Sequence, residues 1–274
     1  MVRSGPIPFN CSGRLLLAAL PLLLLRGPAA AADPSVQFAN IAPLPGAGIA
    51  LGPEGKPDGD GALQINIPVA YTPGADTFSL SVYGGGYIDQ FNPKLQNGTA
   101  VFSAGFGGWP RVFISAMQLS RLLLTDSKAL SAQVQVVRES SRTPAVAVGG
   151  QDLLNKEREL GAARGFYAVA TKSVHFRGGG LHLTIGYGTG RFLDHPFAGI
   201  SAPLGDKFSA AVEYDGFQFN EGIAFRPGGR FGSVTMLAGY NDRCGLILGA
   251  GGAGNMPTVL QLAIGAALIA MREN

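Results

Sequence analysis

Apolar and polar residues alternate along most of the chain beyond residue 60. Residues 181–187 read Leu-His-Leu-Thr-Ile-Gly-Tyr, and residues 208–214 read Phe-Ser-Ala-Ala-Val-Glu-Tyr. Because successive side chains of a β-strand point to opposite faces, each run has one apolar face and one small or polar face. The second run ends in Asp215-Gly216, a pair that suits the positive φ angles of a tight hairpin turn. The pattern predicts an antiparallel sheet built from successive hairpins.

The same alternation predicts strands along the rest of the chain. We expect them at residues 63–71, 78–82, 100–106, 130–136, 146–148, 167–172, 181–187, 199–204, 208–214, 234–240 and 244–249. Residues 111–124 are apolar on both faces and fit a short helix or a strand, and their neighbours favour a strand. Residues 258–271 are nearly all apolar and are predicted to be a closing strand. Pro68 cannot donate to a ladder and indicates a bulge in the first strand.

The length of these runs bears on whether the sheet is soluble or crosses a membrane. With the residues that flank each alternating run, we expect strands of roughly eight to eleven residues, enough for a tilted strand to cross a bilayer. Aromatic residues gather at strand ends, as in membrane barrels: Tyr187, Phe192, Phe197, Tyr214 and Phe217. We therefore predict an all-β fold, an antiparallel up-and-down transmembrane β-barrel of roughly 12 to 14 strands. A secreted soluble β-sandwich or adhesin-like binding module is the alternative, because soluble sandwiches alternate too.

Composition supports the membrane interpretation. Charged residues make up 14% of the chain, against about 25% in soluble domains. Few charges are expected where much of the outer surface faces lipid. The chain also has 41 glycines, which suit tight turns and close strand contacts and argue against a helical protein.

The N-terminus has the features of a secretory signal peptide. Arg3 and Arg14 precede an apolar run at 15–25, and Ala30-Ala31-Ala32 offers small residues for cleavage before Asp33. We expect residues 1–32 to be this leader, residues 33–60 an irregular lead-in rich in proline and glycine, and residues 61–274 the barrel. Removing the leader takes away three arginines and no acid, so 21 basic residues become 18, equal to the 18 acidic ones. No basic footprint for nucleic acid remains.

Strand parity identifies the side chains that are expected to face the lumen. They carry both signs of charge and several amides: Gln64, Asn66, Gln133, Lys172, His182, Glu213 and Arg226. Gly186, Gly199 and Gly222 leave inner wall without side chains, which favours a water-filled passage in a barrel of this size. In a wet lumen, Thr184→Arg would be tolerated. A packed barrel whose inner charges only satisfy one another is the alternative.

A search for catalytic or metal-binding patterns finds none that stands out. The three histidines lack metal-ligand spacing, and no carboxylate pair has acid/base spacing. His182 lies two residues from Thr184, so a membrane hydrolase is conceivable, but a polar pair facing the lumen explains both residues. After leader cleavage only Cys244 remains, which excludes an internal disulfide. We expect a non-enzymatic protein without cofactors.

Strand counting predicts that the long loops, 84–97, 151–164 and 189–195, share the side of the N-terminus.

Short motifs in the second half of the chain resemble a known family. They are Pro144-Ala-Val-Ala-Val-Gly-Gly-Gln-Asp-Leu153, Tyr167-Ala-Val-Ala-Thr-Lys172, Gly186-Tyr-Gly-Thr-Gly-Arg-Phe192, Phe197-Ala-Gly-Ile200 and Ala211-Val-Glu-Tyr-Asp215. This series is similar to the YjbH-like outer-membrane proteins, which are associated with exopolysaccharide production, over about residues 125–240. This chain departs in being compact, in having Ser201 where an acidic residue is expected, and in lacking the lipid-modified cysteine of some relatives.

The resemblance implies a barrel in the cell outer membrane. It assigns no catalytic role to any residue of this chain. It implies a pore or an assembly component linked to exopolysaccharide secretion. The expected partners are outer-membrane lipid and polysaccharide or its export machinery.

Overall fold

The structure, a computed structural model, describes nine segments of the chain. They are residues 44–75, 77–86, 96–121, 124–154, 164–177, 179–216, 218–228, 234–241 and 245–254. The chain divides into two units, Met1–Ala32 and Asp33–Asn274, and all described residues belong to the second. The signal peptide expected at 1–32 and the closing strand expected at 258–271 lie outside the described residues.

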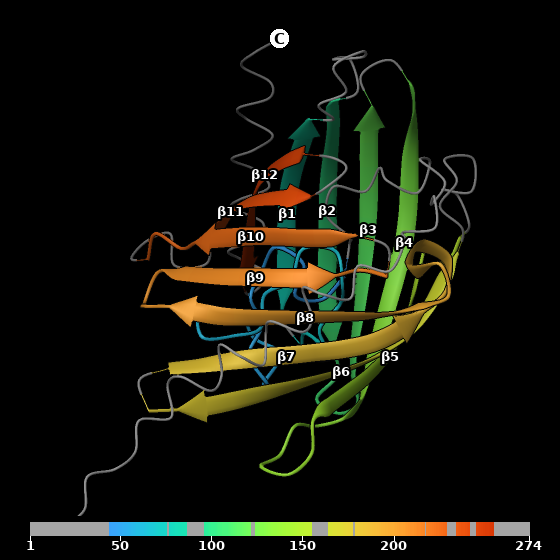
Figure 1. The fold of residues 1–274 in the computed structure, drawn as a ribbon. Helices are drawn as coiled ribbons and strands as arrows, with labels where there is room; N and C mark the ends of the chain where they lie inside the picture. The colour runs from blue at the N-terminus through green and yellow to red at the C-terminus, as the bar shows by residue number, and fades with distance from the viewer. Residues whose placement is uncertain are drawn as a thin grey trace, which may run out of the picture. The chain divides into compact units, whose positions relative to one another are not determined.

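The described residues form twelve antiparallel strands in one closed barrel (Figure 1). The strands are β1 (Phe78–Gly86), β2 (Gln96–Phe106), β3 (Arg111–Arg121), β4 (Leu124–Val137), β5 (Ala145–Gln151), β6 (Gly165–Phe176), β7 (Gly179–Gly188), β8 (His195–Leu204), β9 (Phe208–Tyr214), β10 (Phe219–Phe225), β11 (Val234–Asn241) and β12 (Gly245–Gly254), with one 3₁₀ turn, η5 (Gly190–Phe192). Each strand pairs with its neighbours in sequence, and β12 closes the sheet on β1. The predicted fold class is confirmed. The sandwich alternative is wrong, because one sheet closes on itself.

The two ends of the barrel differ in their connections. We call the end where β1 begins and β12 finishes the terminal end, and the opposite one the loop end. Because neighbouring strands are antiparallel, the long connections β1–β2, β5–β6 and β7–β8 leave from the loop end. The prediction placed them at the end where the chain enters the barrel, and this was wrong, because Leu44 lies beside Thr77 at the terminal end. It counted residues 63–71 as a strand, and one false strand exchanges the two sides.

The outer and inner faces follow the predicted alternation in most strands. On β7, Leu183 and Ile185 point outward and are 40% and 64% exposed, while His182 and Thr184 are buried inside. On β6 the prediction is reversed: Tyr167 and Val169 are buried on the inner face, and Lys172 shares the outer parity. The inner positions of β6 are apolar because they pack against other apolar groups in the lumen.

No helix among the described residues is long and apolar enough to span a bilayer.

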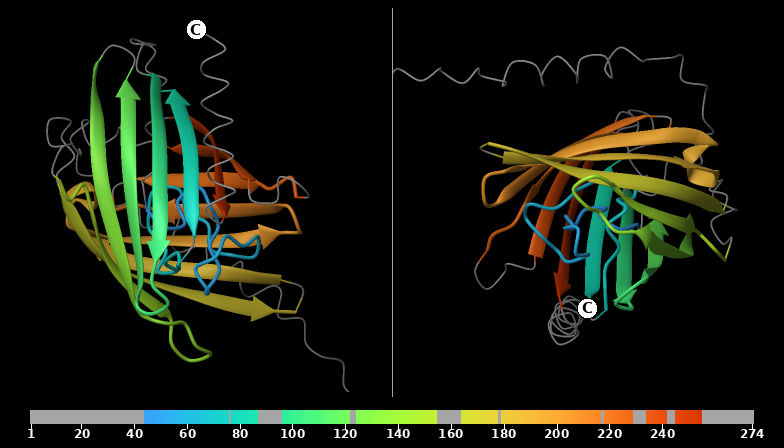
Figure 2. Two further views of the ribbon diagram at one scale, coloured as in Figure 1. Left: turned by 180° about the vertical axis from the view of Figure 1, so that it is seen from behind. Right: turned by 90° about the horizontal axis from the view of Figure 1, so that it is seen from below.

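Residues 44–75, which we call the plug, lie inside the barrel rather than in its wall (Figure 2). Leu63, Ile65, Ile67 and Tyr71 on one face have no exposed surface, and Gln64 and Asn66 on the other are at most 1% exposed, so both faces of the expected first strand are covered. The only regular pairing within the plug's described residues is three isolated bridges, including Ala47 with Gln64. The prediction of a wall strand at 63–71 was therefore wrong.

The closed sheet explains why this alternating segment is not a strand of the wall. Strand β1 already has β2 on one side and β12 on the other, so no edge remains. Within the segment itself, Pro68 lacks an N–H for a ladder. The plug buries its apolar side chains against the inner wall instead.

Glycines on the inner wall make room for bulky neighbours instead of opening a passage. Tyr83 lies over its cross-strand partner Gly249, Tyr167 over Gly149, and Phe197 over Gly186; a Cβ on these glycines would approach the rings to 2.4 Å or less. Gly199 faces the amide of Gln64, and Gly222 faces the end of Ile65. The prediction that Gly186, Gly199 and Gly222 leave open wall was wrong.

Candidate functional site

The barrel wall holds the plug mainly through side chains that bond to the plug's backbone. Backbone N–H groups donate from Leu63 to Ser201 Oγ (3.0 Å), from Ile65 and Asn66 to Glu213, from Ala70 to Thr171 Oγ1 (2.9 Å) and from Thr72 to Gln135 Oε1 (3.2 Å). Plug carbonyls accept from Gln133 (Val69, 3.0 Å), His182 (Asp60, 2.5 Å) and Ser209 (Gly59, 3.1 Å). Buried backbone groups need partners, and here hydroxyls, amides, one imidazole and one carboxyl group supply them.

Glu213 is the centre of this arrangement. It is 1% exposed, and its carboxylate accepts from two consecutive plug amides, Ile65 N at 2.8 Å and Asn66 N at 2.5 Å. Asn220 Nδ2 donates to the same carboxylate at 3.0 Å. A buried donor that loses its only partner costs about 1–3 kcal/mol, and two consecutive plug amides depend on this one side chain, so it is a main anchor of the plug.

A second buried carboxylate lies beyond Glu213 toward the loop end. Asn220 Nδ2 also donates to Asp215 Oδ2 at 3.0 Å and thereby links the two acidic groups. Burial raises the pKa of Asp215, while the amide of Asn220 and the guanidinium of Arg191 act in the opposite direction. Arg191 belongs to η5, and its neighbour Phe192 is fully buried, with its ring 4.6 Å from that of Phe197. This part of the β7–β8 connection therefore narrows the lumen.

At the terminal end, a clasp around Glu139 fixes the exit of the plug. Tyr71 donates its hydroxyl to Glu139 Oε2, and Ser173 donates from its backbone N (2.9 Å) and its hydroxyl (2.6 Å) to Oε1. Lys172 Nζ lies 3.0 Å from the same oxygen. Burial raises the pKa of Glu139, but the hydrogen bonds more than offset it, so the pKa is lowered below the ordinary value.

A second clasp at this end uses Arg111, which the sequence reasoning did not single out. Its guanidinium is buried and donates to the carbonyl of Pro53 at 2.8 Å and to Glu54 Oε2 at 2.9 Å. The Glu54 side chain is 82% exposed. The pair therefore marks the point where the plug emerges from the lumen.

Acidification is expected to weaken the Glu139 clasp. Because the folded pKa is lowered, the clasp stabilises the plug fully above the unfolded value of about 4.3 and loses this effect as the pH falls through the folded value. The amide proton of Ser173, which donates to Glu139, should shift in NMR spectra below about pH 4. Glu139→Gln should remove that titration. A Ser173 signal that does not change down to pH 2 would contradict the assignment.

Five of the seven predicted lumen residues are buried in the lumen, although two of them come from the plug. Gln133, His182 and Glu213 belong to the wall and contact the plug, whereas Gln64 and Asn66 are part of it. The remaining two lie at the terminal end. Arg226 lies against Gly59, where a Cβ would come within 1.2 Å of its guanidinium. Lys172 was predicted to point inward, and this was wrong: it reaches from the outer face to Glu139 and the Ser140 carbonyl.

The structure does not pair His182 with Thr184 for catalysis. The Thr184 hydroxyl bonds to that of Thr171 at 3.0 Å, and His182 Nε2 bonds to the carbonyl of Asp60. Within the described residues, no group of three or more His, Cys, Asp and Glu side chains could hold a metal ion.

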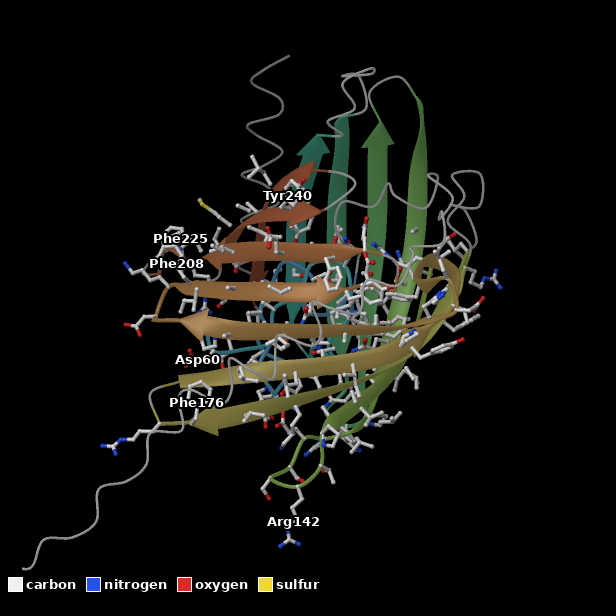
Figure 3. The ribbon with its side chains drawn as sticks, viewed as in Figure 1. Asp60, Arg142, Phe176, Phe208, Phe225 and Tyr240 are labelled. Atoms are coloured by element: carbon white, nitrogen blue, oxygen red, sulfur yellow. The ribbon has the colours of Figure 1, made fainter. Side chains whose placement is uncertain are left out.

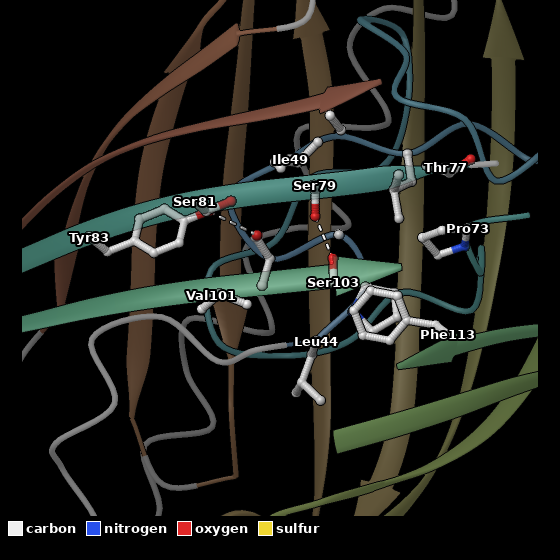
Figure 4. Close-up of a pocket in the computed structure, with 15 residues that line it drawn as sticks. Leu44, Ile49, Pro73, Thr77, Ser79, Ser81, Tyr83, Val101, Ser103 and Phe113 are labelled. Atoms are coloured by element: carbon white, nitrogen blue, oxygen red, sulfur yellow. Dashed lines mark hydrogen bonds between the residues drawn. The ribbon is translucent and has the colours of Figure 1, made fainter. Parts of the chain in front are cut away.

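A small cavity lies between the plug and the inner face of strands β1, β2 and β3 (Figure 4). Its volume is about 30 Å³, and Leu44, Pro73 and Thr77 line it together with Ser81 and Phe113 of the wall. A water needs about 10–15 Å³ of such space, so the cavity has room for about two waters. The plug is packed less closely here than against the Glu213 side.

Comparison with known proteins bears on the sequence motifs. Residues 117–242 match the YjbH family model, described as exopolysaccharide biosynthesis protein YbjH. The resemblance to this family is confirmed. Among solved structures, the chain is similar to the outer membrane protein Omp33 of Acinetobacter baumannii, with 9% identity and a TM-score of 0.36, over 66% of this chain and 98% of that one. The comparison with curated proteins finds no match.

Proposed function

We propose that the chain is a non-enzymatic barrel of the outer membrane that serves exopolysaccharide secretion, as a passage or as an assembly component. The observation that carries this proposal is the distribution of side chains on the barrel. Large apolar side chains are exposed on the outer face all around it, and polar side chains are buried inside. A soluble protein has the opposite arrangement, whereas a lipid-facing barrel needs this one.

The exposed apolar side chains form a band around the outer face of the barrel, and one row of cross-strand neighbours shows its structure. Leu183, Ile200 and Val212 lie side by side on β7, β8 and β9, and the row continues to Lys172 on β6 and to Glu221 on β10. Strands of membrane barrels are tilted by about 35–45°, so such a row runs from one rim to the other. An apolar centre with a charge at each end fits the cross-section of a bilayer.

Aromatic residues lie on the outer face near both ends of the strands. Phe176, Phe208 and Phe225 are near the terminal end, and Tyr240 is near the loop end (Figure 3). The rings of Phe208 and Phe225 are 4.9 Å apart on paired strands. Aromatic girdles of this kind mark the two interfaces of a membrane barrel and support the proposed location.

The link to polysaccharide is supported by the family match over residues 117–242, which covers β4 to β11 and the plug-binding residues from Gln133 to Glu213. The plug occupies the lumen, so we propose that this structure is a closed form. Both a gated passage and a structural assembly role are compatible with a closed barrel.

We expect the protein to float with outer membranes and to require detergent for solubility, because its apolar band needs lipid. In a producing strain, deletion of the gene should reduce secreted exopolysaccharide several-fold without reducing its intracellular precursors. The readouts are flotation in a sucrose gradient and polysaccharide assay of culture supernatants. If the protein is recovered in monodisperse form without detergent, the proposed membrane location is wrong. If the amount of secreted exopolysaccharide is unchanged in the deletion strain, the proposed link to polysaccharide is wrong.

A further inference from the structure

We propose that the plug is displaceable toward the terminal end, and that the lumen it occupies takes an uncharged, hydroxyl-rich polymer chain. This inference rests on the proposed function and adds to it a regulatory element and a charge preference. Four features of the lumen carry it: the path of the plug, the way it is held, the space it fills and the chemistry of the wall behind it.

Both ends of the plug lie at the same end of the barrel. Leu44 and Pro45 line the cavity that Pro73 and Thr77 also line, just before β1 begins. Val69 N donates to the carbonyl of Pro45 at 2.9 Å, so the entering and leaving stretches are adjacent. A loop with this path can be withdrawn toward the terminal end without threading a chain end through the barrel.

The plug is held by separate contacts rather than by a ladder. Its bonds to the wall go mostly to individual side chains, such as Ser201, Thr171 and Glu213, and among the described residues it forms no strand with the wall. Contacts of this kind can break one after another. Glu54, Lys56, Asp58 and Asp60 are exposed at the terminal end, where a pulling partner could reach them.

The space that the plug fills is wide enough for a polymer chain. Ala47 pairs with Gln64, and Leu51 pairs with Ala62, so two backbone passes lie side by side in the lumen. Paired backbones are about 4.8 Å apart before their side chains are added. A lumen that holds two passes with side chains would admit a single extended saccharide chain after withdrawal.

The wall behind the plug carries many polar side chains, and its buried charged ones are three acidic residues, Asp152, Glu213 and Asp215, and two basic ones, Arg111 and Arg191. Its buried hydroxyl and amide side chains include Ser115, Ser131, Gln133, Thr171, Ser201 and Asn220. Such groups both donate and accept hydrogen bonds, as sugar hydroxyls do. Glu213 contributes a carboxylate, which is ionised near neutral pH once hydrated and would repel an anionic chain. The family match favours a saccharide over a peptide as the occupant.

The test uses the full chain in planar bilayers. Ala70→Cys and Thr171→Cys, in a Cys244→Ser background, should form a disulfide that locks the plug, since Ala70 N lies 2.9 Å from Thr171 Oγ1. Glu213→Gln is added to loosen the plug, because an amide retains one acceptor oxygen where the carboxylate has two. A parallel chain also carries Phe192→Ala, which removes the ring that narrows the loop end.

We expect the oxidised chains to be silent and the reduced chains to conduct in steps. A short neutral dextran should lower the open current several-fold more than dextran sulfate of equal length. If both reduced chains, shown to be folded by heat-modifiable migration in gels, stay silent, the plug is permanent and the inference fails. Equal block by dextran sulfate would overturn the charge preference, and block by a peptide of residues 60–75 but not by dextran would overturn the polymer class. Failure to enter bilayers at all would instead contradict the proposed membrane function.

Discussion

Replacing Glu213 by alanine is expected to free the plug from the wall. The substitution removes the acceptor of two buried amides, Ile65 N and Asn66 N. Each buried donor that is left without a partner costs about 1–3 kcal/mol. We therefore expect a loss of about 3 kcal/mol or more in the free energy that holds residues 63–66 in place.

Hydrogen exchange measures this effect directly. Exchange at Ile65 and Asn66 should accelerate on the order of 100-fold in Glu213→Ala, because 1.4 kcal/mol corresponds to a factor of ten. Glu221→Ala is the matched control, since it removes an exposed carboxylate from the outer face of the neighbouring strand and should leave the plug amides protected. Glu213→Gln should fall between the two. If the Glu213→Ala plug exchanges as slowly as the wild type, other contacts hold it and the carboxylate is not its anchor.

The strands of the wall could be predicted from the sequence because their alternation has one consistent cause. On β7, β8 and β9 the outer positions face lipid and the inner positions face polar partners. A hydrophobic residue in these strands therefore indicates the outer face. His182 and Glu213 were assigned to the inner face for this reason, and the structure places them there.

The same reasoning failed where apolar groups lie on the inner side. Tyr167 and Val169 are apolar because they pack on the plug, so an apolar residue on β6 does not identify the lipid face. Residues 63–71 alternate like a strand, yet both sets of side chains are buried. Local pattern cannot reveal that the sheet closes without this segment, because closure depends on the pairing of β1 with β12. Pro68 was the one local sign.

The contacts that hold the plug were also beyond local pattern. Thr171 and Ala70 are 101 residues apart in the chain, and Glu213 and Ile65 are 148 apart. Their proximity follows only from the barrel. Glu139 lies in the turn between β4 and β5, outside any alternating run, so strand parity did not select it. A charged turn residue near a tyrosine-bearing internal segment is recognised only in three dimensions.

Leu183→Arg and Val212→Arg are expected to impair assembly of the barrel in the membrane. Both residues lie in the apolar row on the outer face, and Val212 is 54% exposed. An arginine at the midplane of a membrane barrel costs about 2–4 kcal/mol, and the cost falls to about 0–1 kcal/mol near the interfaces. Glu221→Arg is the matched control, because Glu221 continues the same row at the loop rim. Folding into lipid vesicles, followed by heat-modifiable migration, measures the difference.

The inner face provides a different contrast. Thr184 was expected to tolerate arginine in a wet lumen, but it is 1% exposed and its hydroxyl contacts Thr171 at 3.0 Å. Thr184→Arg is therefore expected to be destabilising through overpacking, typically by about 1–3 kcal/mol. Deleting the plug should relieve this effect and leave that of Val212→Arg unchanged, because only the first acts through the lumen. If Glu221→Arg is as harmful as Val212→Arg, or if plug deletion rescues both, the lipid-facing row has been assigned to the wrong surface.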